Sequence, residues 1–448
     1  MKYRKGSIPK ILLTTVYRRF ERDYYDYFRS NTNSPFRFSL PRKTSYGLRF
    51  LRQNIPEIEI LEYPTWQEYI RKLKQGWDVV GFSFYLNETG EIIRMAEEAR
   101  RQGVKELWAG NYGALTEGVE NYFDKIFIGY GEEKIAELLG KRIERLSHPP
   151  LFYLFSLGPF WLRYKIFGVL FTQRGCPMRC TFCQTPAFCP KPYTIPLEAI
   201  AEVLQYYRKV GVREVVILDE NFATFKSHTE RVVELMNRYG FYFTAMLRAD
   251  WTLKYIDDWV REGFMAALIG VESLSPKILK EINKREEVEA VIEFTERMHR
   301  YHRWVLGYYM IGFEDDTEES IKEDLNRLYK IGIDFHQLCI LTPLPRTPLW
   351  YEIDRKYGIF EKDWRKYDAK HLVWHHPNIS PEKMERLLAW GFKRLNTPQR
   401  YLQSLRNLIV SYLQSRTSGE GVSHLLSAPR YALFFNERAQ GYLSGGHR

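Results

Sequence analysis

The N-terminal third of the chain alternates short apolar runs with segments in which apolar residues recur at helical spacing. Ile92, Met95 and Ala99, for example, share one face of a predicted helix. Strands that alternate with helices predict a parallel, doubly wound α/β sheet of Rossmann type, with ligands bound at the carboxyl ends of its strands. The predicted strands span residues 10–16, 58–62, 78–84, 105–110 and 124–130.

The same alternation returns six times between about residues 167 and 345. One predicted helix begins at Pro196 and ends at Gly211, as helices commonly do. Six consecutive strand–helix units predict a partial (β/α)6 version of the eight-fold TIM barrel, whose active site lies where the strands end. The predicted strands span residues 167–173, 213–219, 242–248, 265–271, 305–312 and 335–342.

The segment between these two regions, residues 148–171, is the most apolar in the chain, but Gly158, Pro159 and two basic residues interrupt it. It is therefore not expected to span a membrane as a helix. Two interpretations stay open: a linker packed across two domains, or a surface that contacts lipid. Beyond residue 350 the pattern is helical and basic, over 380–395 and 399–416.

A chain of 448 residues is too long for one ordinary core and predicts two or three domains. We assign 1–147 to a Rossmann-like domain, 148–166 to the apolar linker, 167–350 to the partial barrel and 351–448 to a helical C-terminal region.

The net charge of +11 suggests a polyanionic partner or an anionic membrane surface. A solvated basic surface of a heat-adapted protein explains the charge equally well. The basic N-terminus is followed only by a short apolar run, so no signal peptide is expected. A cytoplasmic location is predicted, with peripheral contact at the membrane as an option.

Four of the five cysteines fall within fourteen residues, and three of them, Cys176, Cys180 and Cys183, follow the first barrel strand with the spacing Cys-x3-Cys-x2-Cys. This clustering indicates a metal in a reducing compartment rather than a disulfide framework. Zinc sites use paired ligands, and the chain has no second pair. Three thiolates can bind three irons of a [4Fe-4S] cluster and leave the fourth iron open for a small molecule.

The motif "RGCPMRCTFC", in which the aromatic Phe182 immediately precedes the third cysteine, resembles that of radical S-adenosylmethionine (SAM) enzymes. It is similar to the form in members that carry an N-terminal cobalamin-binding domain. The resemblance implies that SAM on the open iron is cleaved reductively to a 5′-deoxyadenosyl radical, which functionalises an unactivated carbon. Phe182 would then pack near the adenine of SAM. An electron donor such as ferredoxin or flavodoxin is also implied.

The resemblance continues through the later barrel strands. "LDENF" stands where the family has an acidic motif, which implies a contact from Asp219 or Glu220 to the methionyl amino group. Arg248 of "LRAD" resembles the residue that faces the SAM carboxylate, and Glu272 of "IGVES" resembles a ligand of the SAM ribose or amine. "TPLPRTPLW" resembles the closing motif of the barrel, with Arg346 in place of glycine. This arginine is either a contact for a substrate anion or a plain surface residue.

Three N-terminal segments, "GFSFYLNET", "AGNYGAL" and "GYGEE", resemble in order and spacing three loops of the cobalamin-binding domain. No histidine precedes His148, so a cobalamin bound here would receive no histidine ligand from this domain. The alternative is a domain that keeps the fold and binds no corrin. The candidate cobalamin contacts are Ser83, Thr89, Gly110, Asn111, Gly113, Gly129 and Gly131.

The leading functional prediction is cobalamin-dependent C-methylation of a hydrophobic, lipid-like substrate by a radical SAM enzyme. Radical carbon–carbon bond formation or cyclisation on a lipid or tetrapyrrole, without cobalamin, is the alternative. A methylthiotransferase acting on tRNA would need a second cluster, and no cysteine precedes Cys176, so nucleic acid is not an expected partner. A non-catalytic corrin-binding or iron-sensing protein would leave SAM intact. Cys189 and Cys339 are weak candidates for a thiol at the barrel mouth and for a hydrogen donor, respectively, against the simpler interpretation as small buried hydrophobes.

Overall fold

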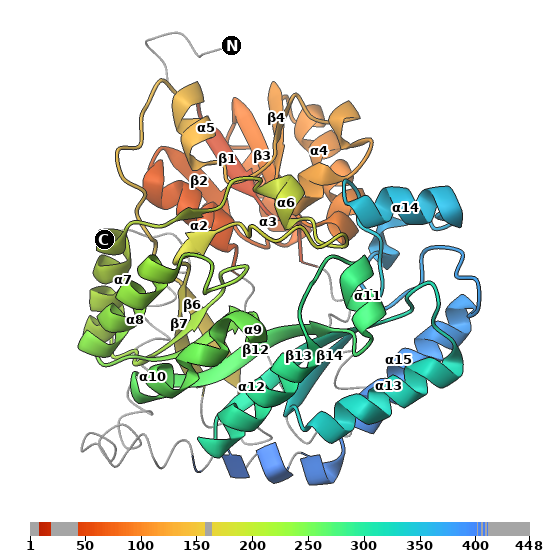
Figure 1. Ribbon diagram of the computed structural model, residues 1–448. Coiled ribbons are helices and arrows are strands. Elements are labelled where there is room, and N and C mark those ends of the chain that lie inside the picture. Colours follow the sequence, from red (N-terminus) through yellow and green to blue (C-terminus); the bar gives the residue numbers. More distant parts are fainter. Residues whose placement is uncertain are drawn as a thin grey trace.

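A computed structural model describes residues 9–18, 44–156 and 164–400, together with residues 402–404, 406–407 and 410. Figure 1 shows an N-terminal α/β domain, coloured red to orange, stacked on a larger barrel-like domain coloured yellow to blue. The short helix α6 (Thr185–Phe188) lies between the two, and its Phe188 packs against Leu115 of the N-terminal domain. The predicted α/β fold class is confirmed.

The N-terminal sheet has five parallel strands in the order β2-β1-β3-β4-β5. This order belongs to doubly wound sheets, and its switch point, between β1 and β3, is where such folds bind ligands. Each predicted strand is present within a few residues. The strands are β1 (Ile11–Thr14), β2 (Ile58–Leu61), β3 (Val79–Ser83), β4 (Glu106–Gly110) and β5 (Lys125–Phe127), and the helices are α2 (Tyr46–Asn54), α3 (Trp66–Leu73), α4 (Thr89–Arg101) and α5 (Glu132–Leu138).

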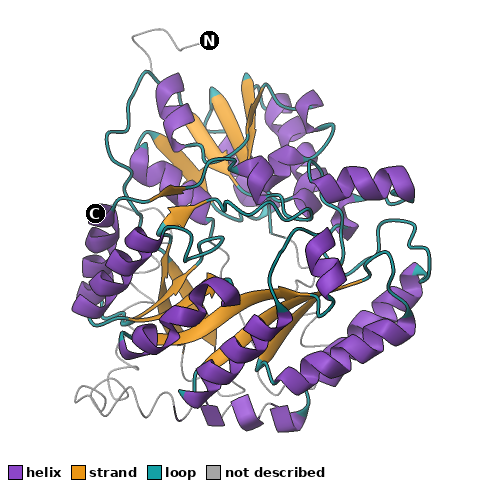
Figure 2. Ribbon diagram, in the orientation of Figure 1, coloured by secondary structure: helices purple, strands orange, loops and turns teal. Residues whose placement is uncertain are grey.

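The second sheet has seven strands in the order β14-β13-β12-β11-β10-β7-β6, and six of them, from β7 to β14, run parallel. The predicted partial barrel is therefore present. Figure 2 shows helices along the outer side of this curved sheet. Its parallel strands are β7 (Tyr164–Leu170), β10 (Glu214–Ile217), β11 (Tyr242–Leu247), β12 (Phe264–Glu272), β13 (Trp304–Ile311) and β14 (Phe335–Ile340).

The helices between these strands cover the buried face of the sheet, where one continuous apolar core lies. Their ranges are α7 (Leu197–Lys209), α8 (Lys226–Arg238), α9 (Ala249–Thr252), α10 (Ile256–Arg261), α11 (Pro276–Glu281), α12 (Val288–Arg300) and α13 (Glu318–Ile331). A two-stranded ribbon, β8 (Gln173–Arg174) with β9 (Tyr193–Thr194), encloses the cysteine segment and α6.

The apolar segment predicted to be a linker, 148–166, contributes a strand of the barrel sheet. Strand β6 (Phe152–Ser156) pairs antiparallel with β7, with Phe152 opposite Gly168 and Ser156 opposite Tyr164. The linker prediction is corrected to this extent, because a run of aromatic and branched residues next to a sheet edge adds to the sheet. Residues 157–163 lie outside the described residues. Among the helices described, none combines the length and the apolar character needed to cross a bilayer.

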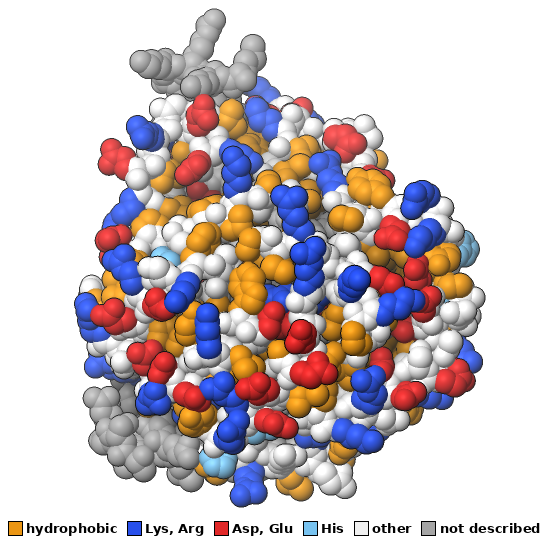
Figure 3. All heavy atoms as spheres, viewed as in Figure 1, with side chains coloured by type: hydrophobic (Ala, Val, Ile, Leu, Met, Phe, Trp, Pro, Cys, Tyr) orange, Lys and Arg blue, Asp and Glu red, His pale blue; other side chains and the backbone are white. Residues whose placement is uncertain are grey.

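The C-terminal region contributes α14 (Pro348–Lys356) and α15 (Pro381–Leu395). Ser380 caps the N-terminus of α15, accepting a hydrogen bond from the Lys383 amide, and the helix packs on α13 and β14. The predicted helix 380–395 is confirmed, and most of 399–416 lies outside the described residues. Figure 3 shows basic and acidic side chains interspersed on one face of the molecule, so the net positive charge does not gather into one patch there.

Candidate active site

The three cysteines of the motif lie on the loop between β8 and α6, which we call the cluster loop (residues 175–184). Cys176, Cys180 and Cys183 are all partly exposed. Burial raises the pKa of each thiol, to about 11 for Cys180, and the neighbouring Cys183 raises the pKa of the other two further. The Cys183 sulfur therefore lies within electrostatic reach of each of the other two.

Gly175 begins the cluster loop in a conformation that favours glycine, with φ at +78°. A Cβ atom at this position would lie 2.8 Å from the Cys189 Sγ and 3.2 Å from the Cys189 carbonyl oxygen. Cys189 is itself buried, and its Sγ donates to the Lys191 carbonyl at 3.5 Å. Cys189 thus serves to pack against the turn that begins the cluster loop.

Gly175→Ala is expected to lower both the stability of the chain and its iron content, because the new methyl group adds a clash to a strained backbone, which costs on the order of 1–3 kcal/mol. Gly76→Ala is a matched control, since Gly76 has φ at +72° with no atom within 4 Å of its Cβ position. We expect Gly76→Ala to lower the thermal unfolding midpoint and to keep its iron. Equal iron content in the two variants would contradict a special role for Gly175.

The far side of the cluster loop is fixed by hydrogen bonds to the barrel. The Thr181 amide donates to the Ile282 carbonyl at 2.9 Å, and the Thr181 carbonyl accepts from the Leu349 amide at 3.0 Å. The Gln184 side chain donates to the Pro345 carbonyl at 2.9 Å. Two of these bonds come from the closing motif "TPLPRTPLW", which therefore holds the cluster loop in place.

The donor set of the cluster loop fits an iron–sulfur cluster. No group of three or more His, Cys, Asp or Glu side chains in the described part of the chain converges tightly enough to bind a single metal ion. Thiolates that bind separate irons of one cluster need not converge in that way, because the cluster itself spans the space between them. Three partly exposed thiols on one loop match that requirement.

The two acidic residues that follow β10 have different roles in the structure. Asp219 is fully buried and accepts from the Thr172 amide at 2.7 Å, from the Thr172 hydroxyl and from the Gln173 amide at 3.3 Å. Burial raises its pKa to about 8. Asp219 therefore holds the end of β7, and Glu220, which is partly exposed, is the residue of this pair that faces the cluster loop. One carboxylate oxygen of Glu220 accepts from the Gly175 amide at 3.0 Å.

Arg248, at the end of β11, is already engaged by the protein. Its Nε and Nη2 donate to the two carboxylate oxygens of Asp250 at 3.0 and 2.7 Å, and its Nη1 donates to the Lys284 carbonyl at 2.8 Å. Only 5% of the residue is exposed. The structure thus places Arg248 as a brace between β11 and the segment after α11, with two of its five N–H groups free of these bonds.

Glu272, at the end of β12, folds back over Gly270. A Cβ atom at Gly270 would lie 2.2 Å from the Glu272 Oε1 and 2.9 Å from the Lys284 Nζ, so only glycine leaves room for both groups. Glu272 has φ at +62°, an uncommon conformation for a side chain of this size. Burial raises its pKa to about 6, while Lys284 acts in the opposite direction. Strained backbone at a polar strand end is typical of a functional site.

Lys284 and Glu286 complete this charged group and were not identified from the sequence. The Lys284 Nζ lies 3.0 Å from the Glu286 carboxylate and 3.9 Å from the Glu272 carboxylate, and all three side chains are largely buried. The neighbouring Asn283 carbonyl accepts from the Cys180 thiol at 3.9 Å. The "NKREE" segment therefore joins the cysteines to Glu272, and a signal for it, a lysine between acidic residues after a short helix, was present in the sequence.

The inner face of the barrel sheet is mainly apolar. Along β13 and β14 buried residues, which belong to the core under the outer helices, alternate with half-buried ones. Because successive side chains point to opposite faces, the half-buried set lines the inner face. Cys339 is one of them, and Glu272 contributes to raising its pKa, which burial brings to about 12. Half-buried apolar residues of this face include Val216, Met246, Leu268, Leu306 and Met310.

The remaining SAM and substrate candidates lie near the cluster loop. Phe182, within the loop, is half-buried and packs against the barrel core. Arg346 is exposed and has φ at +63°, so the glycine found at this position in the family motif would suit the backbone here. Arg346 has the character of a surface residue.

The first group of cobalamin candidates lies at the carboxyl ends of the N-terminal strands, where Ser83 at the end of β3 pairs with Gly110 at the end of β4. Asn111 follows with φ at +67°. Thr89 is 1% exposed, and its hydroxyl donates to the Leu86 carbonyl at 2.7 Å. A Cβ at Gly113 would lie 2.2 Å from the Phe84 ring. Thr89 and Gly113 therefore have roles in internal packing. Ser83, Gly110 and Asn111 are partly exposed at the carboxyl ends of the strands, which we call the ligand edge of the sheet.

The "GYGEE" candidates have structural roles of their own. Gly129 has φ at +91°, and a Cβ there would lie 2.9 Å from the Phe188 carbonyl oxygen. Gly131 stands at the N-terminus of α5, where a Cβ would meet Ile135 at 3.3 Å and Leu51 at 3.4 Å. This loop lies against the barrel domain.

His148, the first histidine of the chain, is buried and committed to the backbone. Its Nε2 accepts from the Phe171 amide at 3.0 Å, and its Nδ1 lies 2.7 Å from the Pro149 carbonyl. Burial lowers the pKa of His148 to about 3, so the ring is neutral. It is not available as a ligand.

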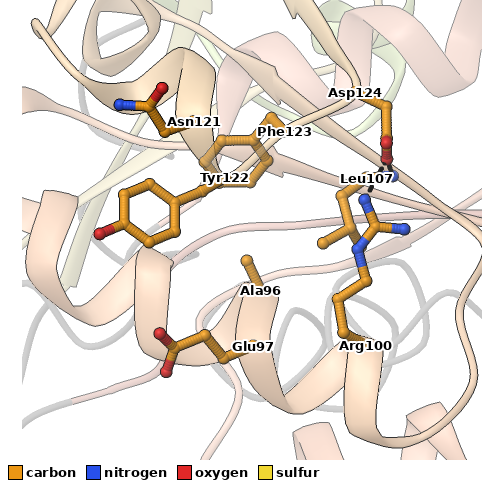
Figure 4. A pocket seen from close by; sticks show the side chains of 8 residues that line it. All are labelled: Ala96, Glu97, Arg100, Leu107, Asn121, Tyr122, Phe123 and Asp124. Atoms are coloured by element: carbon orange, nitrogen blue, oxygen red, sulfur yellow. Dashed lines mark hydrogen bonds and ion pairs between the residues drawn. The ribbon is translucent and has the colours of Figure 1, made fainter.

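A pocket of about 270 Å³ opens on the N-terminal domain, between α4 and the residues that follow it toward β5. Figure 4 shows Arg100 and Asp124 on its wall, joined as an ion pair. Its lining includes no residue of the cluster loop or of the charged group around Glu272. This pocket is separate from the candidate active site.

Comparison with known proteins identifies the family. A family model described as the radical SAM superfamily matches residues 170–328, the stretch that runs from the end of β7 into α13. This match identifies residues 170–328 as a radical SAM domain. As a radical SAM enzyme it has a [4Fe-4S] cluster and SAM as cofactors, and it needs a source of electrons.

Three similar proteins illustrate what the chain resembles. A bacteriochlorophyllide d C-12(1)-methyltransferase of Chlorobaculum tepidum is 26% identical over 338 residues, covering 69% of this chain and 72% of the relative. A hopanoid C-2 methylase of Rhodopseudomonas palustris is 24% identical over 221 residues, or 47% of this chain and 42% of the relative. The radical SAM methyltransferase TsrM of Kitasatospora setae, solved with cobalamin and a [4Fe-4S] cluster bound, has a TM-score of 0.60 at 14% identity, covering 78% of this chain and 75% of TsrM. The last likeness shows a shared fold.

Proposed function

We propose that this radical SAM enzyme is a cobalamin-dependent methyltransferase that methylates a carbon atom of a hydrophobic substrate. The observation that carries this proposal is the position of the ligand edge of the N-terminal sheet, which lies against α6, the helix that directly follows the cluster loop. Tyr112, just beyond β4, stacks on Phe188 of α6 with ring centroids 4.3 Å apart, and its hydroxyl lies 3.2 Å from that of Thr185. A cobalamin bound at that edge would therefore lie beside the SAM site.

The proposed cluster ligands are Cys176, Cys180 and Cys183, and the proposed SAM contacts are the groups that surround them. When bound, the cluster and SAM supply a radical, and cobalamin supplies a transferable methyl group. Glu220 and Glu272 offer carboxylates to the amino group and ribose of SAM. Phe182 would pack beside the adenine. Arg248 stabilises the SAM site through its hydrogen bonds to the Asp250 carboxylate and the Lys284 carbonyl.

The apolar inner face of the barrel supports a hydrophobic substrate. Side chains such as Leu268, Leu306 and Met310 offer contacts to hydrocarbon and exclude water from a reactive radical. The two relatives are named for methylation of a bacteriochlorophyllide and of a hopanoid. A substrate of that class, lipid or tetrapyrrole, is proposed here, and the net charge of +11 favours an acidic electron donor of the ferredoxin or flavodoxin class.

Metal content and methyl transfer test this proposal. Chain purified anaerobically with hydroxocobalamin supplied is expected to contain about one cobalt and four irons, the content of one corrin and one [4Fe-4S] cluster. Incubation with SAM carrying a ¹³C-methyl group should then label an apolar polycyclic substrate, read by mass spectrometry. Four irons without cobalt, together with SAM cleavage and no transferred label, would favour radical bond formation or cyclisation instead.

A further inference from the structure

The segment that leads from β5 into α5, residues 129–132, contacts residues on either side of the cluster loop, and we call it the docking loop. It belongs to the N-terminal domain, while the cluster loop belongs to the barrel. Its sequence, Gly-Tyr-Gly-Glu, was expected to contact cobalamin. The contacts described below give it a different role.

The first contact is a buried ion pair between the two domains. The Arg174 Nη2 lies 2.8 Å from the Glu132 carboxylate, with 2% and 5% of the two side chains exposed. The Arg174 guanidinium also stacks between the rings of Tyr130 and Phe50, at 4.1 and 4.4 Å from their centroids. Arg174 immediately precedes Gly175, so this pair fixes the point at which the cluster loop begins.

The second contact reaches the cluster loop through Glu220. The Tyr130 hydroxyl donates to one carboxylate oxygen of Glu220 at 2.6 Å, and the other oxygen accepts from the Gly175 amide at 3.0 Å. Glu220 is thus held between the docking loop and the first residue of the cluster loop. Its orientation depends on a residue of the other domain.

The third contact is to α6, the helix that follows the cluster loop. The absence of a side chain at Gly129 allows the Phe188 carbonyl to approach, and the Tyr130 ring meets the Phe188 ring edge-on with centroids 5.4 Å apart. Phe188 ends α6, whose first residue, Thr185, donates its amide to the Cys183 sulfur at 3.4 Å. The docking loop therefore braces the segments before the first cysteine and after the third.

We propose that the docking loop of the N-terminal domain positions the cluster loop, with Tyr130 and Glu132 as positioning residues for the cluster site. This inference rests on the proposed role of the three cysteines, and it does not depend on whether the domain binds cobalamin. It gives the N-terminal domain a part in holding the cluster that a corrin-free domain would keep. Partners that orient metal ligands commonly change metal affinity 10-fold to 100-fold when replaced.

The test compares Tyr130→Phe and Glu132→Gln with Glu133→Gln in the full chain. Glu133 is the exposed neighbour of Glu132 on the same helix, so its replacement controls for the loss of a charge at that place. Each variant is reconstituted anaerobically with iron and sulfide, and the rate of iron loss to a chelator is measured. We expect Tyr130→Phe and Glu132→Gln to lose iron about 10-fold faster than the parent chain, and Glu133→Gln to match it.

A general loss of stability is separated by two further measurements, the thermal unfolding midpoint and the electron paramagnetic resonance spectrum of the reduced cluster. A displaced cluster loop should broaden that spectrum in Tyr130→Phe at an unchanged midpoint, because the cluster then has more than one environment. If Glu132→Gln fails to fold, Tyr130→Phe, which removes a single hydroxyl, decides the matter. Unchanged iron loss and an unchanged spectrum in folded Tyr130→Phe would overturn the inference.

The outcome is distinguishable from failure of the proposed function. If the parent chain holds four irons without cobalt and the docking-loop variants lose iron faster, the inference is supported and cobalamin is excluded from the proposed function. Retention of iron after replacement of the cluster cysteines would instead remove the site on which both proposals rest.

Discussion

Replacement of Cys176, Cys180 or Cys183 by alanine is expected to yield a chain with almost no iron and no visible iron–sulfur absorption, and with no cleavage of SAM. Each thiolate would bind a separate iron, and hydrogen bonds fix the loop that presents them at both ends, so each variant lacks one of three anchors of the cluster. The measurement is iron and sulfide per chain after anaerobic reconstitution, with 5′-deoxyadenosine as the product of SAM cleavage.

Cys339→Ala is the matched control for the cysteine variants. Cys339 lies on the inner face of β14 and belongs to a different part of the barrel from the cluster loop. Its replacement should leave iron content and the absorption spectrum unchanged. Full iron and normal SAM cleavage in any one of the three cluster-loop variants would remove that cysteine from the proposed ligand set.

The strands of both sheets could be predicted from the sequence because parallel strands buried on both faces give short, nearly continuous apolar runs. The run that became β3 and the run that became β12 are examples, and helices of clear amphipathic pattern separate them from their neighbours. The order of the strands in each sheet was not predicted, because the right-handed crossovers of α/β folds limit the possible topologies without fixing one order. The sequence therefore predicted the two-domain α/β architecture well.

Strand β6 could not be predicted in the same way. Its residues, Phe152–Ser156, read as part of one long apolar segment, and the pattern alone does not distinguish a strand from a packed linker. These residues form a strand because β7 offers an edge for pairing, and that edge exists only once the barrel sheet has formed. Long-range pairing of this kind leaves no local signal.

Site residues were predictable to the extent that each stands in a motif. The acidic motif after β10 does not show by itself whether Asp219 or Glu220 faces the cluster loop. That depends on which side chain reaches Thr172 at the end of the neighbouring strand. The docking role of Tyr130 and Glu132 was missed for a related reason. Both make their contacts to residues of the other domain, and sequence spacing says nothing about such pairs.

Glu272→Gln is expected to weaken SAM binding about 10-fold to 100-fold while the iron content stays intact, because a charge-assisted hydrogen bond contributes about 1.5–3 kcal/mol. Of the carboxylates of Glu272, Glu286 and Asp250, that of Glu272 is the least neutralised by a neighbouring cation. Lys284 lies 3.0 Å from Glu286 and 3.9 Å from Glu272, and Arg248 is paired with Asp250. These five side chains carry three negative and two positive charges, so one negative charge remains.

SAM carries a sulfonium, an ammonium and a carboxylate, and its net charge of +1 matches that remaining negative charge. Glutamine keeps the shape of Glu272 and removes the charge, so the variant isolates the electrostatic part of binding. Glu281→Gln, at an exposed position at the end of α11, controls for loss of a carboxylate elsewhere and should bind SAM normally. Affinity is measured by calorimetry on the reconstituted chain. If Glu272→Gln bound SAM as tightly as the parent, the cation of SAM would have to meet Glu220 instead, the other partly exposed carboxylate beside the cluster loop.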